Sequence, residues 1–135
     1  MNLPPDVITW MDSFEAAVRT RNFSAGRKLF SPNVRSFGTL ADDVHDLDSL
    51  VDRQWSITWQ KTQHFEFEPD STTCHVSDNG RTAIVFSKWS SQRSSDGGLR
   101  QGRSTIVLVR EGIADAWVAI HSHFSLTPLD GGQLV

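Results

Sequence analysis

The sequence predicts an α+β domain in which three N-terminal helices pack against one face of a curved, mixed or antiparallel sheet. Two observations support this class. Apolar residues recur at helical spacing through the first part of the chain, whereas from residue 62 onward they alternate with polar residues between turn signals. Helices followed by a run of strands are typical of α+β proteins rather than of alternating βα units.

The first helix is expected at residues 7–18, after a pair of prolines, because its apolar residues share one face. A second, short helix is expected to begin at a Ser24 cap and to end near Leu29 and Phe30, since Pro32 opposes helical geometry in the residue before it. A short strand is expected at residues 34–37. An acidic loop then leads into the third helix, whose apolar stripe consists of Leu47, Leu50, Val51, Trp55 and, at its end, Trp59.

The rest of the chain has the two-residue period of strands. Glutamates alternate with phenylalanines before Pro69, which gives the first of these strands one wet and one buried face. Asn79-Gly80 and the glycines that follow Asp96 are turn signals between the longer strands. The expected strands are residues 64–68, 74–76, 82–93, 99–110 and 117–125.

Length and composition indicate one domain. The chain has 135 residues, of which 38% are hydrophobic and 21% charged, so we expect a domain at residues 1–128 and a short tail at 129–135. A net charge of -3 without a basic cluster argues against a nucleic-acid partner. The single Cys74 cannot form an internal disulfide, and neither a signal peptide nor a membrane span is evident, so a cytoplasmic location is expected.

Several short motifs occur in an order that is difficult to produce by chance. They are Phe30-Ser-Pro-Asn-Val34, Phe37-Gly-Thr39, the Trp55 helix, Gly102-Arg103-Ser-Thr105 and Trp117-x-x-Ile120-His121-x-His123-x-Ser125. Over residues 5–128 the chain resembles the SnoaL-like division of the nuclear transport factor two-like superfamily. The resemblance implies a conical α+β barrel that encloses a pocket, and commonly a homodimer. Its members include ketosteroid isomerases, polyketide cyclases, dehydratases and a kinase association domain, so the fold leaves the function open.

Catalysis of the isomerase type needs a carboxylate base and a neutral donor, usually a tyrosine, and this chain has no tyrosine. The candidate bases are Asp42 and Asp43 in the acidic loop, or His121 and His123 on the last strand. The aspartates also suit a solvated loop before a helix. The histidines are the better candidates, because a strand holds a side chain firmly and imidazole titrates near neutral pH. Strict alternation places both on the same face as Trp117.

The association domain of calcium/calmodulin-dependent kinase II is similar in its last strand, and Arg103 matches the position of a pocket arginine there. The arginine that follows the second histidine in that family is replaced here by Phe124, so the carboxylate site is half missing. One guanidinium can still bind an anionic group through two hydrogen bonds. The alternative is that Arg103 pairs with Glu66 or Glu68 across the sheet.

The two histidines on one strand face also have a spacing that suits zinc, but no third ligand is evident, so neither a metal nor a cofactor is predicted. Trp55, Trp59 and Trp89 are candidates for the wall of an aromatic cavity, with core packing as the alternative. Cys74 has no activating partner in the sequence and is assigned a structural role.

Two functions stay open. The first is a small-molecule-binding protein with an apolar, aromatic pocket for a small organic ligand, either neutral or anionic, with or without a cofactorless isomerase, cyclase or lyase activity. The second is a non-catalytic domain for homo-oligomerisation or partner association. Strands such as residues 82–89 carry apolar groups on both faces, so a homodimer through the outer face of the sheet is expected.

Overall fold

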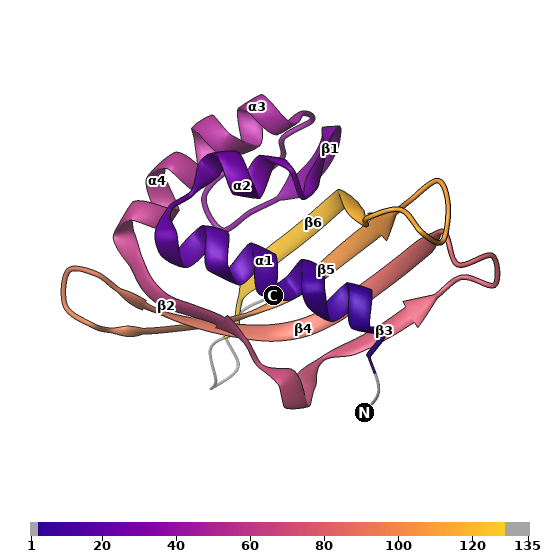
Figure 1. The fold of residues 1–135 in the computed structure, drawn as a ribbon. Helices are drawn as coiled ribbons and strands as arrows, with labels where there is room; N and C mark the ends of the chain where they lie inside the picture. Colours follow the sequence, from indigo (N-terminus) through magenta and orange to yellow (C-terminus); the bar gives the residue numbers. More distant parts are fainter. Residues whose placement is uncertain (1–2, 129–135) are drawn as a thin grey trace.

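Helices cover the concave side of a curved six-stranded sheet (Figure 1). The computed structural model describes residues 3–128, so the tail expected at residues 129–135 lies outside the described residues. The α+β class is confirmed. The sheet is open, because its path runs from the edge strand β1 to the edge strand β2 without returning.

The helical layer has three parts in the expected order. α1 (Pro5–Thr20) begins at a proline, which is tolerated in the first helical turn, and buries an apolar face that includes Trp10 and Phe14. α2 (Phe23–Arg27) is capped by the Asn22 side chain, which accepts a hydrogen bond from the amide of Ala25, so the expected Ser24 cap is wrong. The third part is continuous and consists of α3 (Leu47–Leu50), the π-helical η1 (Val51–Trp55), α4 (Ser56–Thr58) and the 3-10 helix η2 (Trp59–Lys61).

The strands occupy the expected regions with shifted ends. β1 starts earlier than expected, at Phe30, and accommodates Pro32 because an edge strand tolerates a missing amide. A short 3-10 turn, η3 (Pro69–Ser71), separates the second and third strands. The strands are β1 (Phe30–Phe37), β2 (Thr62–Phe67), β3 (Thr73–Val76), β4 (Thr82–Arg93), β5 (Leu99–Val109) and β6 (Val118–Leu126).

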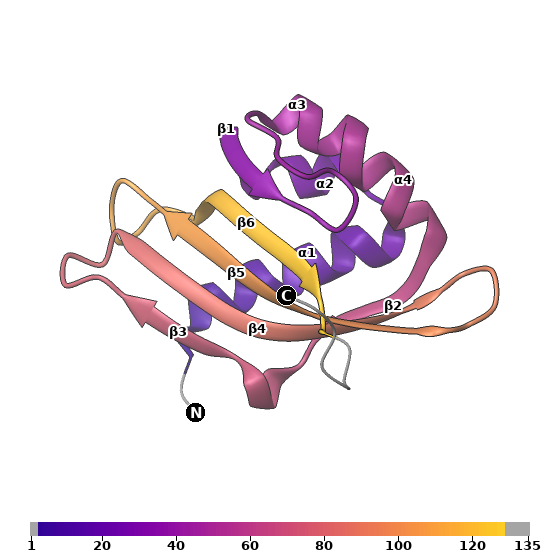
Figure 2. The ribbon, with the colours of Figure 1, turned by 180° about the vertical axis from the view of Figure 1, so that it is seen from behind.

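The sheet is mixed. Its order is β1-β6-β5-β4-β2, with β3 also paired to β4, and only the β1–β6 pair is parallel. β2 and β3 therefore share one long neighbour, β4, and extend the sheet at different points along it. The view from behind shows β4, β5 and β6 without helices over them (Figure 2). We call this convex side the outer face.

Alternation along the central strands separates the two sides of the sheet. On β4, Val85, Trp89 and Ser91 are buried toward the helices, whereas Phe86 and Lys88 are exposed on the outer face. On β6 the alternation is interrupted, because the register with β5 shifts between Val107 and Leu108. No helix of the described residues 3–128 is long and apolar enough to cross a membrane.

Candidate functional site

A cavity of about 70 Å³ lies between the helical layer and the concave side of the sheet. Its surface is mainly apolar, and the lining residues come from α1, the third helical part, β1 with the loop after it, and four further strands. The aromatic residues that line it are Phe14, Phe30, Trp55, Trp59, Phe65, Trp89 and Phe124. Such a wall gives an apolar ligand a large contact area.

Helical spacing brings two of the tryptophans together. Trp55 and Trp59 are four residues apart, so they share a face, and their rings stack with centroids 4.5 Å apart. Gly26 of α2 lies against both rings, because a Cβ there would be 2.9 Å from Trp59 and 3.0 Å from Trp55. Trp55, Trp59 and Trp89 all line the cavity and are also almost fully buried, so pocket wall and core packing describe the same side chains.

Arg100 on β5 provides the charge at the cavity. Its guanidinium lies 5.8 Å from the ring centroid of Trp89. Within residues 3–128 it has neither a carboxylate partner nor a side-chain hydrogen bond. Burial, followed by the charge of Arg93, lowers the pKa of Arg100 below its ordinary value. The side chain is half-buried and positively charged, and its charge is not balanced by this part of the chain.

Gln54 fixes the loop at the mouth of the cavity. Its Oε1 accepts hydrogen bonds from the amides of Leu40 (2.9 Å) and Ala41 (2.7 Å), and its Nε2 donates to Thr39 Oγ1 (3.0 Å). Gln54 lies in the π-helical turn η1, and such turns occur often at functional sites. The loop thus takes three of the four hydrogen bonds that the Gln54 amide can form, so Gln54 positions the mouth.

The polar remainder of the cavity wall consists of hydroxyl groups. Ser36 and Ser122 lie 2.7 Å apart between their Oγ atoms, and Ser36 also donates to the carbonyl of Ser122. Among the described residues that line the cavity, Arg100 is the one ionisable side chain. The wall that this part of the chain forms therefore offers an anion contact and apolar surface, but neither a carboxylate nor an imidazole to take a proton.

Arg103 lies on the outer face. It is three residues from Arg100 on the same strand, so the two side chains point to opposite sides of the sheet. Its Nε and one terminal nitrogen donate to Ser125 Oγ, at 3.3 and 3.1 Å. Arg103 does not line the cavity, and within residues 3–128 it forms no ion pair with Glu66 or Glu68.

His121 and His123 also point to the outer face, and neither lines the cavity. The shared face of the two histidines agrees with strict alternation, but Trp117 does not share it. Trp117 and Ala119 are buried, and Ile120 is the additional residue where the register shifts. Phe37 contacts both imidazole rings, with centroid distances of 5.2 and 5.5 Å.

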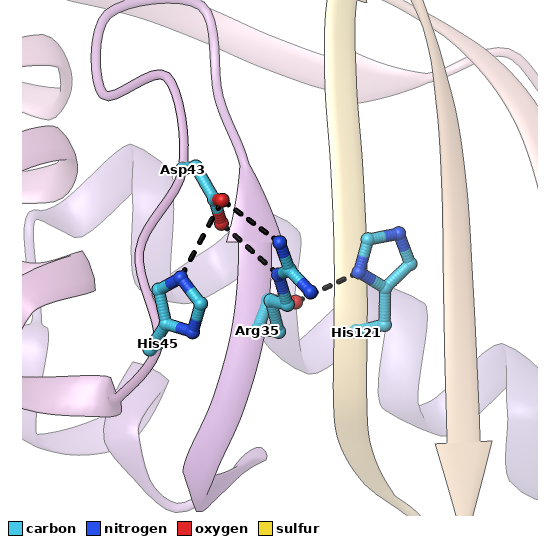
Figure 3. Close-up of polar contacts among 4 residues, drawn as sticks. All are labelled: Arg35, Asp43, His45 and His121. Carbon is cyan, nitrogen blue, oxygen red and sulfur yellow. Dashed lines mark hydrogen bonds and ion pairs between the residues drawn. The ribbon is translucent and has the colours of Figure 1, made fainter.

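A polar group that includes Asp43 lies at the edge strand β1, outside the cavity (Figure 3). Arg35 donates to both carboxylate oxygens of Asp43, at 3.1 and 2.9 Å, and holds the pKa of Asp43 below its ordinary value. His45 Nε2 is 3.4 Å from the same carboxylate, and the Nδ1 atom of His121 lies 2.8 Å from the Arg35 carbonyl oxygen. Asp42 does not line the cavity either, so the predicted bases lie elsewhere.

The described residues contain no group of three or more histidine, cysteine, aspartate or glutamate side chains placed to bind a metal ion. Arg100 and Gln54 are the site residues that the sequence interpretation missed. Both could be suspected only from structure-dependent signals. For Arg100 the signal is that it points to the same side as Trp89, and for Gln54 it is that it lies next to Trp55 on a helix.

Comparison with known proteins identifies the fold. A model of the SnoaL-like domain family matches residues 7–130. The structure is similar to a nuclear transport factor 2-like superfamily protein from Salmonella enterica serovar Typhimurium (TM-score 0.73, 18% identity, 93% of this chain and 92% of that chain). It is also similar to a candidate ketosteroid isomerase from Shewanella frigidimarina (TM-score 0.73, 19% identity, 89% and 94%).

A third similar structure is a candidate calcium/calmodulin-dependent protein kinase II association domain from Xanthomonas campestris (TM-score 0.76, 18% identity, 95% of this chain and 90% of that chain). At these identities the solved structures show the fold and not the activity. A search of curated protein sequences finds no match.

Proposed function

Because this chain belongs to the SnoaL-like domain family, we propose that its cavity binds a small organic anion. The apolar part of the ligand contacts the aromatic wall, and its anionic group pairs with the guanidinium of Arg100. The observation that carries this proposal is the half-buried Arg100, which has no carboxylate partner within residues 3–128 and lies at a cavity whose described wall is otherwise uncharged and rich in aromatic side chains.

A partly desolvated charge without a partner is costly, so an anionic ligand gains more here than at a fully hydrated arginine. A carboxylate can accept two parallel hydrogen bonds from one guanidinium. The cavity volume of 70 Å³ is about two water volumes, so the enclosed part of the ligand is a short chain or small ring edge.

The proposed activity is binding rather than proton transfer. Isomerase-type chemistry needs a base within hydrogen-bond distance of the reacting carbon, and no carboxylate or imidazole of the described residues lines the cavity. His121 and His123 lie on the outer face of the sheet, so their position does not support a catalytic role toward a ligand in the cavity. A domain that only assembles has no use for an unpaired charge at an aromatic cavity, so assembly alone is the less favoured function.

The proposal is tested with short carboxylates, from butanoate to octanoate, and intrinsic tryptophan fluorescence. Three of the five tryptophans line the cavity, so its occupation changes the emission. We expect saturable binding, and we expect Arg100→Met to raise the Kd by about tenfold or more, the loss of one charge-assisted contact. Arg103→Met on the outer face is the matched control and leaves the Kd unchanged. Equal effects of the two substitutions, or no saturation by any carboxylate, would contradict the proposal.

A further inference from the structure

A second, larger hollow of about 760 Å³ adjoins the cavity. Thr39, Thr58, Thr62 and Arg100 line both hollows, so Arg100 lies where they join. We call the outer hollow the vestibule. Its lining residues include Leu40, Ile57, Lys61, Arg93 and Arg100.

The vestibule is positively charged. Lys61, Arg93 and Arg100 line it, and none of its described lining residues is acidic. Asp96 balances one of these charges, since its Oδ1 is 3.1 Å from Arg93 Nε. Lys61 and Arg100 have no carboxylate partner within residues 3–128, which leaves two unbalanced charges around one hollow.

The rim of the vestibule is apolar on its helical side. Leu40 and Ile57 are 52% and 39% exposed, so both present apolar surface beside the charged hollow. A ligand whose chain lies in the cavity places its charged end in the vestibule, near the cations and beside this rim. The two adjoining hollows, the positive charge of the vestibule and its apolar rim thus fit one elongated, amphipathic molecule.

We propose that the vestibule is a subsite for a dianionic headgroup, and that the ligand is a phosphate monoester with a short apolar chain. This inference rests on the proposed function, because it assigns the chain to the aromatic cavity and the inner oxygens of the headgroup to Arg100. A phosphate monoester carries close to two negative charges above its second pKa of about 6. Arg100 supplies a planar fork and Lys61 a point charge, the two ways in which proteins hold phosphate.

The test compares hexyl phosphate with hexanoate by tryptophan fluorescence at about pH 7.5, where the phosphate is a dianion. We expect hexyl phosphate to bind at least about fivefold more tightly, the gain of one additional ion contact in a partly exposed site. Lys61→Met removes this preference and leaves the hexanoate affinity unchanged. Lys88→Met, on the exposed outer face of β4, is the matched control and changes neither. Thermal unfolding establishes that each variant is folded.

The failures of the two proposals are distinguishable. Equal affinities of the wild-type protein for hexyl phosphate and hexanoate, or a preference that survives Lys61→Met, would overturn the dianion subsite but leave a dependence of hexanoate on Arg100 intact. Loss of that dependence overturns the proposed function itself. Inorganic phosphate, tested alone, must bind more weakly than hexyl phosphate. If it binds equally well, the vestibule takes free phosphate without the cavity, and the inference is wrong.

Discussion

A single buried arginine fastens the first helix to the far end of the sheet. The side chain of Arg110 is 7% exposed, donates to the carbonyl of Gly80 at 2.9 Å and stacks on Trp117, with 3.8 Å between guanidinium carbon and ring centroid. It also pairs with Asp6 in the first turn of α1. Because α1 forms one wall of the cavity through Phe14, this contact helps to hold the site in shape.

The ion pair makes the stability of the protein depend on pH. Partial burial opposes ionisation of Asp6, but contacts with Trp117 and Arg110 outweigh it and lower the pKa of Asp6. A group whose pKa is lower when folded contributes stability above its unfolded pKa, about 3.9, and loses it as the pH falls through the folded value.

We therefore expect Asp6→Asn to lower the free energy of unfolding by about 1 kcal/mol near neutral pH, a value reduced because Asp6 is half-exposed. The difference from wild type decreases as the pH falls through the folded pKa of Asp6, because protonation removes the charge that pairs with Arg110. Urea denaturation at several pH values measures both. Asp12→Asn, on the exposed side of α1, is the control. A pH-independent loss would mean that Asp6 acts through packing and not through charge.

Single residues of the site were only partly predictable. Alternation shows that Arg100 and Arg103 face opposite ways, but both faces of β5 mix polar and apolar residues, so the sequence does not tell which face meets the helices. The resemblance to the association domain pointed to Arg103, and the structure places it outside. The register shift at Ile120 separates Trp117 from the histidines, and no local signal in the sequence marks such a bulge.

At the scale of elements, β4 and β5 form the longest ladder. One glycine of β5 allows a close approach of side chain and backbone next to the cavity. Gly102 pairs with Trp89, whose indole lies across it; Trp89 Nε1 donates to the carbonyl of Arg103 at 3.2 Å. A Cβ at residue 102 would be 2.1 Å from the Ser125 carbonyl oxygen and 2.3 Å from the Trp89 ring. A glycine inside a strand often marks such a close approach.

Gly102→Ala is therefore expected to lower the free energy of unfolding by about 2–3 kcal/mol, because the backbone of β6 cannot retreat without losing its pairing. It also weakens ligand binding, since Trp89 must move. Gly112→Ala is the control: its Cβ would meet only the flexible Asp115 carboxylate, at 3.3 Å, in an exposed turn. Urea denaturation compares the two. Similar midpoints for both variants would show that the sheet adapts around residue 102.

The helices and strands were predicted well where a long stretch of sequence follows one hydrophobic period. The turn signals placed β4 at residues 82–93 without error, and the third helix was expected where a helical segment lies. The π-helical turn within that segment was not foreseen, because one additional residue hardly changes an apolar period over two turns. The Asn22 cap was missed because Ser24 has an equally suitable side chain.

At the scale of the whole molecule, long-range pairing decides the shape. The sequence order of strands does not reveal that β1 pairs in parallel with β6, from which most of the chain separates it. It also does not reveal that β2 and β3 both pair with β4. Family resemblance supplied the curved architecture that periodicity alone could not. The cavity follows from that pairing, since it brings Phe30 of β1, Trp89 of β4 and Phe124 of β6 to one place.

The outer face is left uncovered, and its rows of side chains cross the sheet. Phe86 of β4, Thr105 of β5, His123 of β6 and Phe37 of β1 are successive partners in one such row. Phe86 is 47% exposed, and Ile120, at the register shift of β6, is 41% exposed. A second copy of the chain is the partner that we propose for this face, because apolar groups on both sides of a sheet are typical of an interface.

Phe86→Glu tests this dimer. We expect the wild-type chain at micromolar concentration to scatter light as a particle of twice its mass of 15.1 kDa, and the variant as a single chain. Each dimer contains the substitution twice, so burying two unpaired carboxylates should raise the dissociation constant by about a hundredfold or more. Ile113→Glu, in the exposed turn between β5 and β6, is the control, because residue 113 is 71% exposed and outside the sheet.

A wild-type mass of 15.1 kDa would refute the dimer, whereas a dimer that survives Phe86→Glu would place the interface on another surface. Neither result changes the assignment of Arg100, whose side chain points to the opposite side of the sheet.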